Sequence, residues 1–118
     1  MESKDLFTTY EKNGVVVIEL PVRMDASISD GLKEIILNNV SNNKYKFIID
    51  FKKTTFIDSS GLGAIVSKIS VCRTNNGDAR LCNVNERIKE VLNITHLDKI
   101  LKIYNSLDEC INSFSANG

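Results

Sequence analysis

The residue types best suited to chemistry lie together in one segment, Phe56-Ile57-Asp58-Ser59-Ser60-Gly61-Leu62-Gly63. An apolar approach ends there in small polar residues, which lead directly into an apolar pattern of helical period. In alternating α/β folds, ligand and partner sites lie beyond the strand ends, where such junctions occur. The start of a helix presents unpaired N–H groups and a positive dipole end, which favour an added phosphoryl group. Because the neighbouring side chains are small, another protein's active site can reach Ser59, and the segment fits a modifiable serine.

The same segment also permits a purely structural interpretation. The run Asp58-Ser59-Ser60-Gly61 is a good N-terminal cap for a helix, because a carboxylate or hydroxyl oxygen accepts hydrogen bonds from the first-turn N–H groups. Such caps are far commoner than modification sites, and short motifs often match by chance. The residues by themselves leave both interpretations open.

Enzymatic interpretations of this segment fit less well. Gly61-Leu62-Gly63 is not a dinucleotide-binding fingerprint, because Val66 occupies the place of the third glycine. It is not a phosphate-binding P-loop, because no Gly-Lys-Ser/Thr follows. Neither serine lies in a Gly-x-Ser-x-Gly elbow, since Ile57 and Asp58 stand where an upstream glycine is needed. We therefore expect no catalytic residue and no cofactor, and a protein that is not an enzyme.

Histidine and cysteine give no support for a metal site. The only histidine, His96, lies in a stretch that resembles a connection between elements. The cysteines Cys72, Cys82 and Cys110 are widely spaced and form no Cys-x-x-Cys pair. This pattern favours small buried thiols in a reducing cytoplasm over metal or redox chemistry.

Composition narrows the classes of partner. The chain has 118 residues, with 15 Lys and Arg against 15 Asp and Glu, and 42% of its residues are hydrophobic, which suits one domain over residues 1–118. The balanced charge counts against nucleic-acid binding and against general attraction to membranes or acidic ligands. The first 14 residues show no signal-peptide pattern, and no apolar run approaches the roughly 20 residues of a membrane helix. We expect a cytoplasmic protein that recognises its partner through a local site.

Hydrophobic periodicity and turn signals predict the elements that position this segment. Strands are expected at residues 6–10, 15–20, 47–51, 79–84 and 100–104. Helices are expected after a cap at Asp25 or Ser27, from Ser59 to Asn76-Gly77, from Asn85, and from the capping box at residues 106–109. An Asn13-Gly14 turn joins the first strands into a hairpin. The order predicts an α/β fold: a mixed sheet of about five strands with about four α-helices, an N-terminal hairpin and then alternating strands and helices.

The segment Phe56-Ile57-Asp58-Ser59-Ser60-Gly61-Leu62-Gly63 resembles the signature of the STAS domains that act as anti-sigma factor antagonists. Three further segments resemble the link before the first helix, the central strand and the approach to the last strand of that family: Leu20-Pro21-Val22-Arg23-Met24-Asp25, Ile48-Ile49-Asp50-Phe51 and Val91-Leu92-Asn93-Ile94-Thr95-His96-Leu97-Asp98-Lys99-Ile100. The resemblance spans nearly the whole chain, and it implies a single STAS domain.

The resemblance implies a partner switch. The unphosphorylated antagonist binds an anti-sigma factor, which is also a serine kinase of the histidine-kinase-like ATPase fold, and thereby frees a sigma factor. The kinase phosphorylates the first serine of the motif, here Ser59, and the complex separates. A PP2C-type phosphatase restores the binding form. For this chain we expect no cofactor, and the capped helices suggest a monomer.

The resemblance also implies which residues contact the partner. Asp25 and Asp58 match family positions that flank the phosphorylated serine, where they can cap helices as well. The matches to the first turn of the partner-contacting helix are Ser60, Gly61, Leu62 and Gly63. Leu62 fits a simple core position equally well.

Two positions depart from the family pattern. Val22 stands where the family usually has glycine, which predicts a different loop shape before Asp25 and a different partner surface. His96 replaces a frequent glycine, which predicts an altered connection into the last strand. Two rival functions also stay open: a non-switching STAS scaffold in a stress-signalling or lipid-transport assembly, and an enzyme or nucleotide-binding protein. The latter lacks a phosphate loop and a second candidate base near Ser59.

Overall fold

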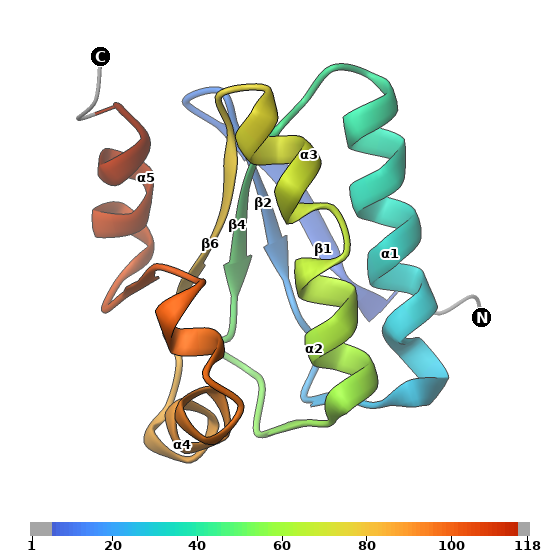
Figure 1. The fold of residues 1–118 in the computed structure, drawn as a ribbon, viewed down its shortest axis with the longest axis vertical. Coiled ribbons are helices and arrows are strands. Elements are labelled where there is room, and N and C mark those ends of the chain that lie inside the picture. The colour runs from blue at the N-terminus through green and yellow to red at the C-terminus, as the bar shows by residue number, and fades with distance from the viewer. Residues whose placement is uncertain (1–5, 116–118) are drawn as a thin grey trace.

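The centre of the fold is a mixed five-stranded sheet, seen in a computed structural model that describes residues 6–115 (Figure 1). In spatial order its strands are β1 (Thr8–Lys12), β2 (Val15–Glu19), β4 (Lys46–Asp50), β6 (Asp78–Cys82) and β7 (Ile103–Tyr104). β1 pairs antiparallel with β2, and the remaining neighbours pair in parallel. Asn13 and Gly14 both have positive φ, 54° and 79°, as a tight hairpin turn requires. The predicted α/β architecture with its N-terminal hairpin is confirmed.

The helices of the fold are α1 (Ala26–Ser41), α2 (Ser59–Val66), α3 (Ile69–Thr74), α4 (Glu86–Ile94) and α5 (Leu107–Ser115). α1 to α4 bury their apolar faces in one core with one face of the sheet, while α5 covers a second cluster on the other face. Figure 1 shows α5 on the opposite side of the sheet from α1, α2 and α3. Covered on both faces, the central strands β2 and β4 are almost fully buried, which explains their nearly continuous apolar sequences.

The helix predicted from Ser59 to Asn76 is divided, and this part of the prediction was wrong. α2 ends at Val66 and α3 begins at Ile69. The Ser67 hydroxyl donates to the Ala64 carbonyl at 2.8 Å, which competes with the regular helix ladder. Lys68 then adopts φ −124° and ψ 17°, outside the helical range. The apolar stripe continues across the break because both short helices pack on the same core.

Two short elements were not predicted. A two-stranded parallel sheet pairs β3 (Arg23–Met24) with β5 (Phe56–Ile57), and a 3₁₀ turn, η2, spans Leu97–Lys99. His96 precedes η2 with φ 62°, in the left-handed region that glycine adopts most easily. Glycine would adopt this conformation at the lowest cost, and His96 adopts it despite its side chain.

A buried ion-pair network ties α3 and α5 to β6. Arg80 Nε donates to Asp78 Oδ2 at 2.9 Å, and Arg73 Nε donates to Asp78 Oδ1 at 3.0 Å. Arg80 Nη1 also donates to the Ser113 hydroxyl at 2.7 Å, and its guanidinium stacks over the Phe114 ring at 4.2 Å. Asp78 and Arg80 are almost fully buried, so removing either partner leaves an uncompensated charge.

This network makes stability depend on pH. Burial by itself opposes ionisation of Asp78, but hydrogen bonds from Arg80 and Arg73 outweigh it and lower the pKa of this carboxyl below 3.8. The unfolded chain then binds the proton more readily, so the stabilisation is complete above the unfolded value and is lost as pH falls through the folded value. We expect Asp78→Asn to lower the free energy of unfolding by about 3–5 kcal/mol near neutral pH. Urea unfolding should be measured from neutral pH down to about pH 2. The difference in the free energy of unfolding between wild type and Asp78→Asn should become smaller as the pH falls.

Asp30→Asn, at an exposed position of α1, is the control. If the free energies of unfolding of wild type and Asp78→Asn differ by the same amount at every acid pH, this role of Asp78 is contradicted.

Candidate functional site

Ser59 is the first residue of α2 and its side chain faces solvent. Within residues 6–115 no hydrogen bond holds its hydroxyl. Ser60, the next residue, is half-buried. The Ser59 oxygen is therefore free to approach a phosphoryl donor from solvent without breaking an internal contact.

Asp58 caps α2 in the way the sequence predicts. Its Oδ1 accepts from the Gly61 N–H at 3.0 Å, and its carbonyl accepts from the Leu62 N–H at 3.0 Å. The N–H groups of Ser59 and Ser60 lie in the same first turn, where a helix has no internal acceptors for them. Added negative charge on the Ser59 oxygen thus meets two kinds of neighbour, unpaired N–H groups that favour it and the Asp58 carboxylate that opposes it.

The small parallel sheet brings Asp25 beside Asp58. Arg23 pairs with Phe56 and Met24 with Ile57, and the Asp58 N–H donates to the Met24 carbonyl at 3.1 Å. The next residue of each strand is an N-cap, Asp25 for α1 and Asp58 for α2. Two neighbouring helices consequently begin at the same edge of the molecule, as Figure 1 shows at its lower end.

Asp25 is an ionised cap. Its Oδ1 accepts from the Ser27 hydroxyl at 2.5 Å and from the Ser27 N–H at 3.0 Å. These hydrogen bonds, with a smaller contribution from the Arg23 guanidinium at 3.8 Å, hold the pKa of Asp25 below its usual range. Asp25 therefore stays negatively charged at neutral pH. It adds a second carboxylate to the surface that surrounds Ser59.

The loop that leads into the site is fixed by buried polar groups that sequence reasoning missed. Thr54 is 1% exposed, and its hydroxyl donates to the Pro21 carbonyl at 2.9 Å. Its own carbonyl accepts from Asn85 Nδ2 at 3.1 Å, which ties the start of α4 to this loop. Asp50, also 1% exposed, accepts from the Lys52 N–H and from Asn83 Nδ2, both at 3.0 Å. Ordinary polar residues carry no sequence signal for such long-range contacts.

The glycines of the motif have different environments. A Cβ atom on Gly61 would lie 2.7 Å from the Met24 carbonyl oxygen and 2.8 Å from Ile57 Cγ1, so glycine is needed for the approach of α2 to β3 and β5. A Cβ atom on Gly63 would meet nothing within 4 Å.

Leu62 is 6% exposed and packs in the main core, which is the alternative role that its sequence position allowed. Four of the predicted contact residues are at least partly exposed to solvent: Asp25, Asp58, Ser60 and Gly63.

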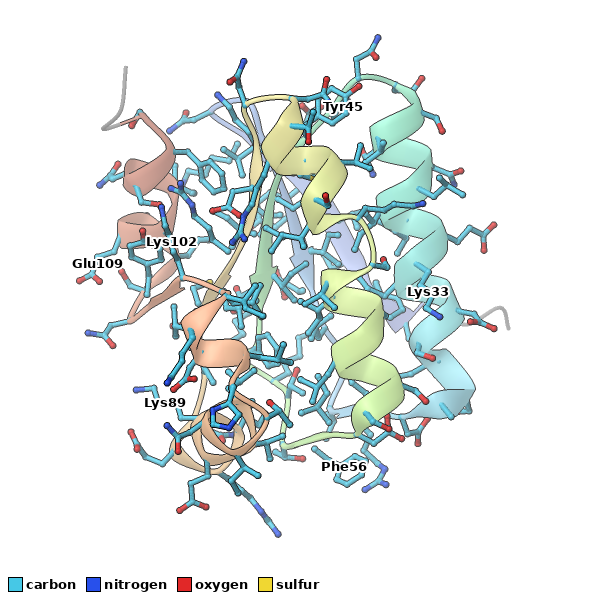
Figure 2. All side chains as sticks on the ribbon, viewed as in Figure 1. Lys33, Tyr45, Phe56, Lys89, Lys102 and Glu109 are labelled. Carbon is cyan, nitrogen blue, oxygen red and sulfur yellow. The ribbon has the colours of Figure 1, made fainter. Side chains whose placement is uncertain are left out.

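An exposed patch beside Ser59 was not predicted. We call Val22, Arg23 and Phe56 the Arg23–Phe56 patch, because the Arg23 guanidinium lies 4.2 Å from the centre of the Phe56 ring. Val22 is 53% exposed and Phe56 is 37% exposed. Figure 2 shows Phe56 projecting from the lower end of the molecule, next to the start of α2. Two features of the sequence could have indicated this patch: Val22 at a position where glycine was expected, and the aromatic residue Phe56 at the start of the motif.

The loop around Val22 does not need a glycine. Its carbonyl accepts from the Thr55 N–H at 2.8 Å, and Val22 is not among the described residues with positive φ. The departure from the family pattern therefore adds an exposed apolar side chain to the patch and leaves the hydrogen bonds between the two loops in place.

The family model of the STAS domain matches residues 7–110 of this chain. The chain belongs to the STAS domain family. This STAS domain is 28% identical over 94 residues to the anti-sigma F factor antagonist of Paenibacillus polymyxa, covering 79% of this chain and 80% of that protein. The resemblance seen in the sequence is confirmed.

Solved structures share the fold. The crystal structure of a candidate anti-sigma factor antagonist from Thermotoga maritima superposes with a TM-score of 0.85 at 23% identity, covering 96% of this chain and 97% of that one. The phosphorylated form of the Bacillus cell fate determinant SpoIIAA superposes with a TM-score of 0.71 at 20% identity, covering 91% of this chain and 97% of that one. At these identities the likeness shows the STAS fold.

Other predicted features of this STAS domain lie away from the site. Cys72, Cys82 and Cys110 are free and buried, as predicted, and burial raises the pKa of the Cys72 thiol. Among residues 6–115, no His, Cys, Asp or Glu side chains gather in a set of three or more that could hold a metal ion. None of the helices in that part of the chain has the length and apolar character needed to cross a membrane.

Proposed function

We propose that this STAS domain is an anti-sigma factor antagonist whose affinity for its partner is controlled by phosphorylation of Ser59. The observation that carries the proposal is the exposed Ser59 hydroxyl, which starts α2 without an internal hydrogen bond to the described residues. The relative from Paenibacillus polymyxa is named an anti-sigma F factor antagonist, and the structural neighbour SpoIIAA is described in a phosphorylated form. Both names support the same function for this chain.

The proposed partner is an anti-sigma factor that is also a serine kinase of the histidine-kinase-like ATPase fold. It binds the surface around unphosphorylated Ser59, which includes Asp25, Asp58, Ser60 and Gly63, and so releases a sigma factor. Gly61 and Leu62 support that surface from within, since both are buried. A PP2C-type phosphatase removes the phosphate and restores binding. The exchange takes place in the cytoplasm between monomers of this chain and its protein partners, without nucleic acid, a membrane or a cofactor.

The electrostatics of the site support a switch that acts on the complex and spares the fold. A phosphoserine carries a charge of about −1.5 to −2 at neutral pH. The unpaired N–H groups at the start of α2 offset part of that charge in the free protein, where water solvates the rest. In a complex the phosphate loses that water and faces the carboxylates of Asp25 and Asp58 as well as the partner. Phosphorylation of Ser59 is therefore expected to weaken binding to the partner and to leave the fold intact.

The modified residue is the direct test. After incubation with ATP and the kinase, mass spectrometry of proteolytic fragments should place a single phosphate on Ser59. Ser59→Ala should abolish the phosphate and still bind the kinase, while Ser70→Ala, at an exposed serine of α3, serves as the matched control and should be phosphorylated normally. A phosphate on Ser60 or Thr55 would refute the assignment. A tight complex without any phosphate transfer would favour the non-switching scaffold.

A further inference from the structure

A second surface feature lies near the β7 edge of the sheet, on elements that the Ser59 site does not use. A groove of about 640 Å³ runs between α4 and β7, and we call it the α4–β7 groove. Its walls include Glu86, Glu90 and Ile94 from α4, Asp98 from η2 and Ile103 from β7. α4 forms the lower left of the molecule in Figure 1, apart from the start of α2.

The groove contains an apolar contact surface. Ile94, the last residue of α4, is 76% exposed, the largest exposed fraction among the large hydrophobic residues recorded as exposed in the described part of the chain. Ile103 is half-buried on the opposite wall. Ile100, 47% exposed, continues the apolar surface into an adjoining hollow of about 490 Å³. Isoleucine side chains at this exposure gain free energy when a partner covers them.

The charge of the groove is negative on the α4 side. Lys89 lies 3.5 Å from Glu86 and forms an ion pair with it, which leaves Glu90 and Asp98 without a cation among the described residues. Asp98 Oδ2 accepts from Asn93 Nδ2 at 3.0 Å. Asp98 Oδ1 is covered from solvent and receives no hydrogen bond from the described residues. The hydrogen bonds of the described residues therefore satisfy the Asp98 carboxylate only in part, and its negative charge has no cation beside it.

The adjoining hollow has the opposite character. It shares Asp98 and Ile103 with the α4–β7 groove but is flanked by Lys99 and Lys102. Figure 2 shows Lys89 at the lower left on α4, and Lys102 higher on the same side of the molecule. A bound segment that places a cation beside Glu90 and Asp98 is therefore fixed in direction, because the same cation would be repelled at the other end.

We propose that the α4–β7 groove binds a peptide segment of a partner protein that presents an aliphatic side chain next to a lysine or arginine. The aliphatic side chain covers Ile94 and Ile103, and the cation lies between the carboxylates of Glu90 and Asp98, which have no cationic partner among the described residues. An acidic peptide or a nucleic acid has the wrong charge for this wall. The proposal does not depend on phosphorylation of Ser59.

The test is a selection of random 12-residue displayed peptides on the full chain, with peptides that also bind Ile94→Asp removed. Selected peptides should carry Lys or Arg within about two residues of Leu, Ile, Val or Met. In fluorescence anisotropy, Ile94→Asp and Glu90→Lys should each weaken the selected peptide about tenfold or more. Asp98→Asn, which keeps the side-chain shape, should weaken lysine- or arginine-containing peptides and leave analogues with glutamine at that position unchanged.

Matched variants keep the test specific. Asp30→Lys makes the same charge change as Glu90→Lys on α1, and Ser59→Asp adds charge at the other site; both should leave peptide affinity unchanged, and circular dichroism verifies folding. Failure to select any peptide, selection without excess Lys or Arg, or equal binding by Asp98→Asn and wild type would overturn the proposal. Sedimentation of the chain alone tests whether a second copy of the chain occupies the groove instead of a partner peptide. A dimer that dissociates in the Ile94→Asp variant would show that it does, and would overturn the proposal.

Discussion

Phosphorylation of Ser59 is expected to weaken the complex with the kinase by about 100-fold or more, while the free energy of unfolding changes by less than about 1 kcal/mol. The asymmetry follows from where the oxygen lies. In the free protein the phosphate stays in water beside the first-turn N–H groups of α2, which is a favourable place for an anion. In the complex it is desolvated next to Asp25 and Asp58, and a penalty of about 2.7 kcal/mol already gives a factor of 100.

Isothermal titration of the kinase with phosphorylated protein, Ser59→Asp and wild type measures this effect. Ser59→Asp should reproduce part of the loss, because it adds one charge instead of about two. Ser70→Asp, at an exposed serine of α3, is the matched control and should bind like wild type. Raising the salt concentration should reduce the difference, since the carboxylates at this surface are partly screened. Equal affinity of the phosphorylated and unmodified proteins would contradict the mechanism.

The sequence predicts most of the architecture because the relevant signals are local. The hairpin follows from Asn13-Gly14, whose positive φ angles few other residue pairs accept. The caps at Asp25, Asp58 and Asn85 follow from side chains that bond N–H groups two or three residues ahead. The apolar stripes of the helices are periodic over several turns, so the core face of each could be predicted with few errors.

Features that arise from long-range contacts could not be predicted in this way. The two-residue strands β3 and β5 are too short to show a period. They are held together by long-range backbone hydrogen bonds, in which the Val22 carbonyl accepts from the Thr55 N–H and the Met24 carbonyl accepts from the Asp58 N–H. The break between α2 and α3 coincides with the hydrogen bond from the Ser67 hydroxyl to the Ala64 carbonyl, and the unbroken apolar stripe of the sequence gives no sign of it. The Arg23–Phe56 patch needs both partners to be placed before it can be recognised. The candidate site is therefore predictable as a segment, whereas its surface requires the structure.

Substitutions at the motif glycines should separate folding from recognition. Gly61→Ala is expected to lower the free energy of unfolding by about 2–3 kcal/mol, because its Cβ atom would overlap the Met24 carbonyl oxygen, a backbone atom that cannot rotate away. Gly63→Ala is expected to raise the free energy of unfolding by about 0.5–1 kcal/mol, because alanine favours a helix and its Cβ atom has open space. Thermal and urea unfolding of the two variants measure both changes, with wild type as the reference.

Kinase binding then shows what Gly63 contributes. Gly63→Gln keeps the gain in helix propensity and places a long side chain on the exposed face of α2, one turn after Ser59. If the kinase approaches that face closely, this variant folds at least as stably as wild type but binds about tenfold or more weakly in the same titration. Full affinity in Gly63→Gln would remove Gly63 from the interface and leave Asp25, Asp58 and the Arg23–Phe56 patch as the surface next to Ser59. A stable variant that fails to bind cannot owe its loss to misfolding, so the pair Gly61 and Gly63 distinguishes the residue that holds α2 in place from the residue that keeps its surface open.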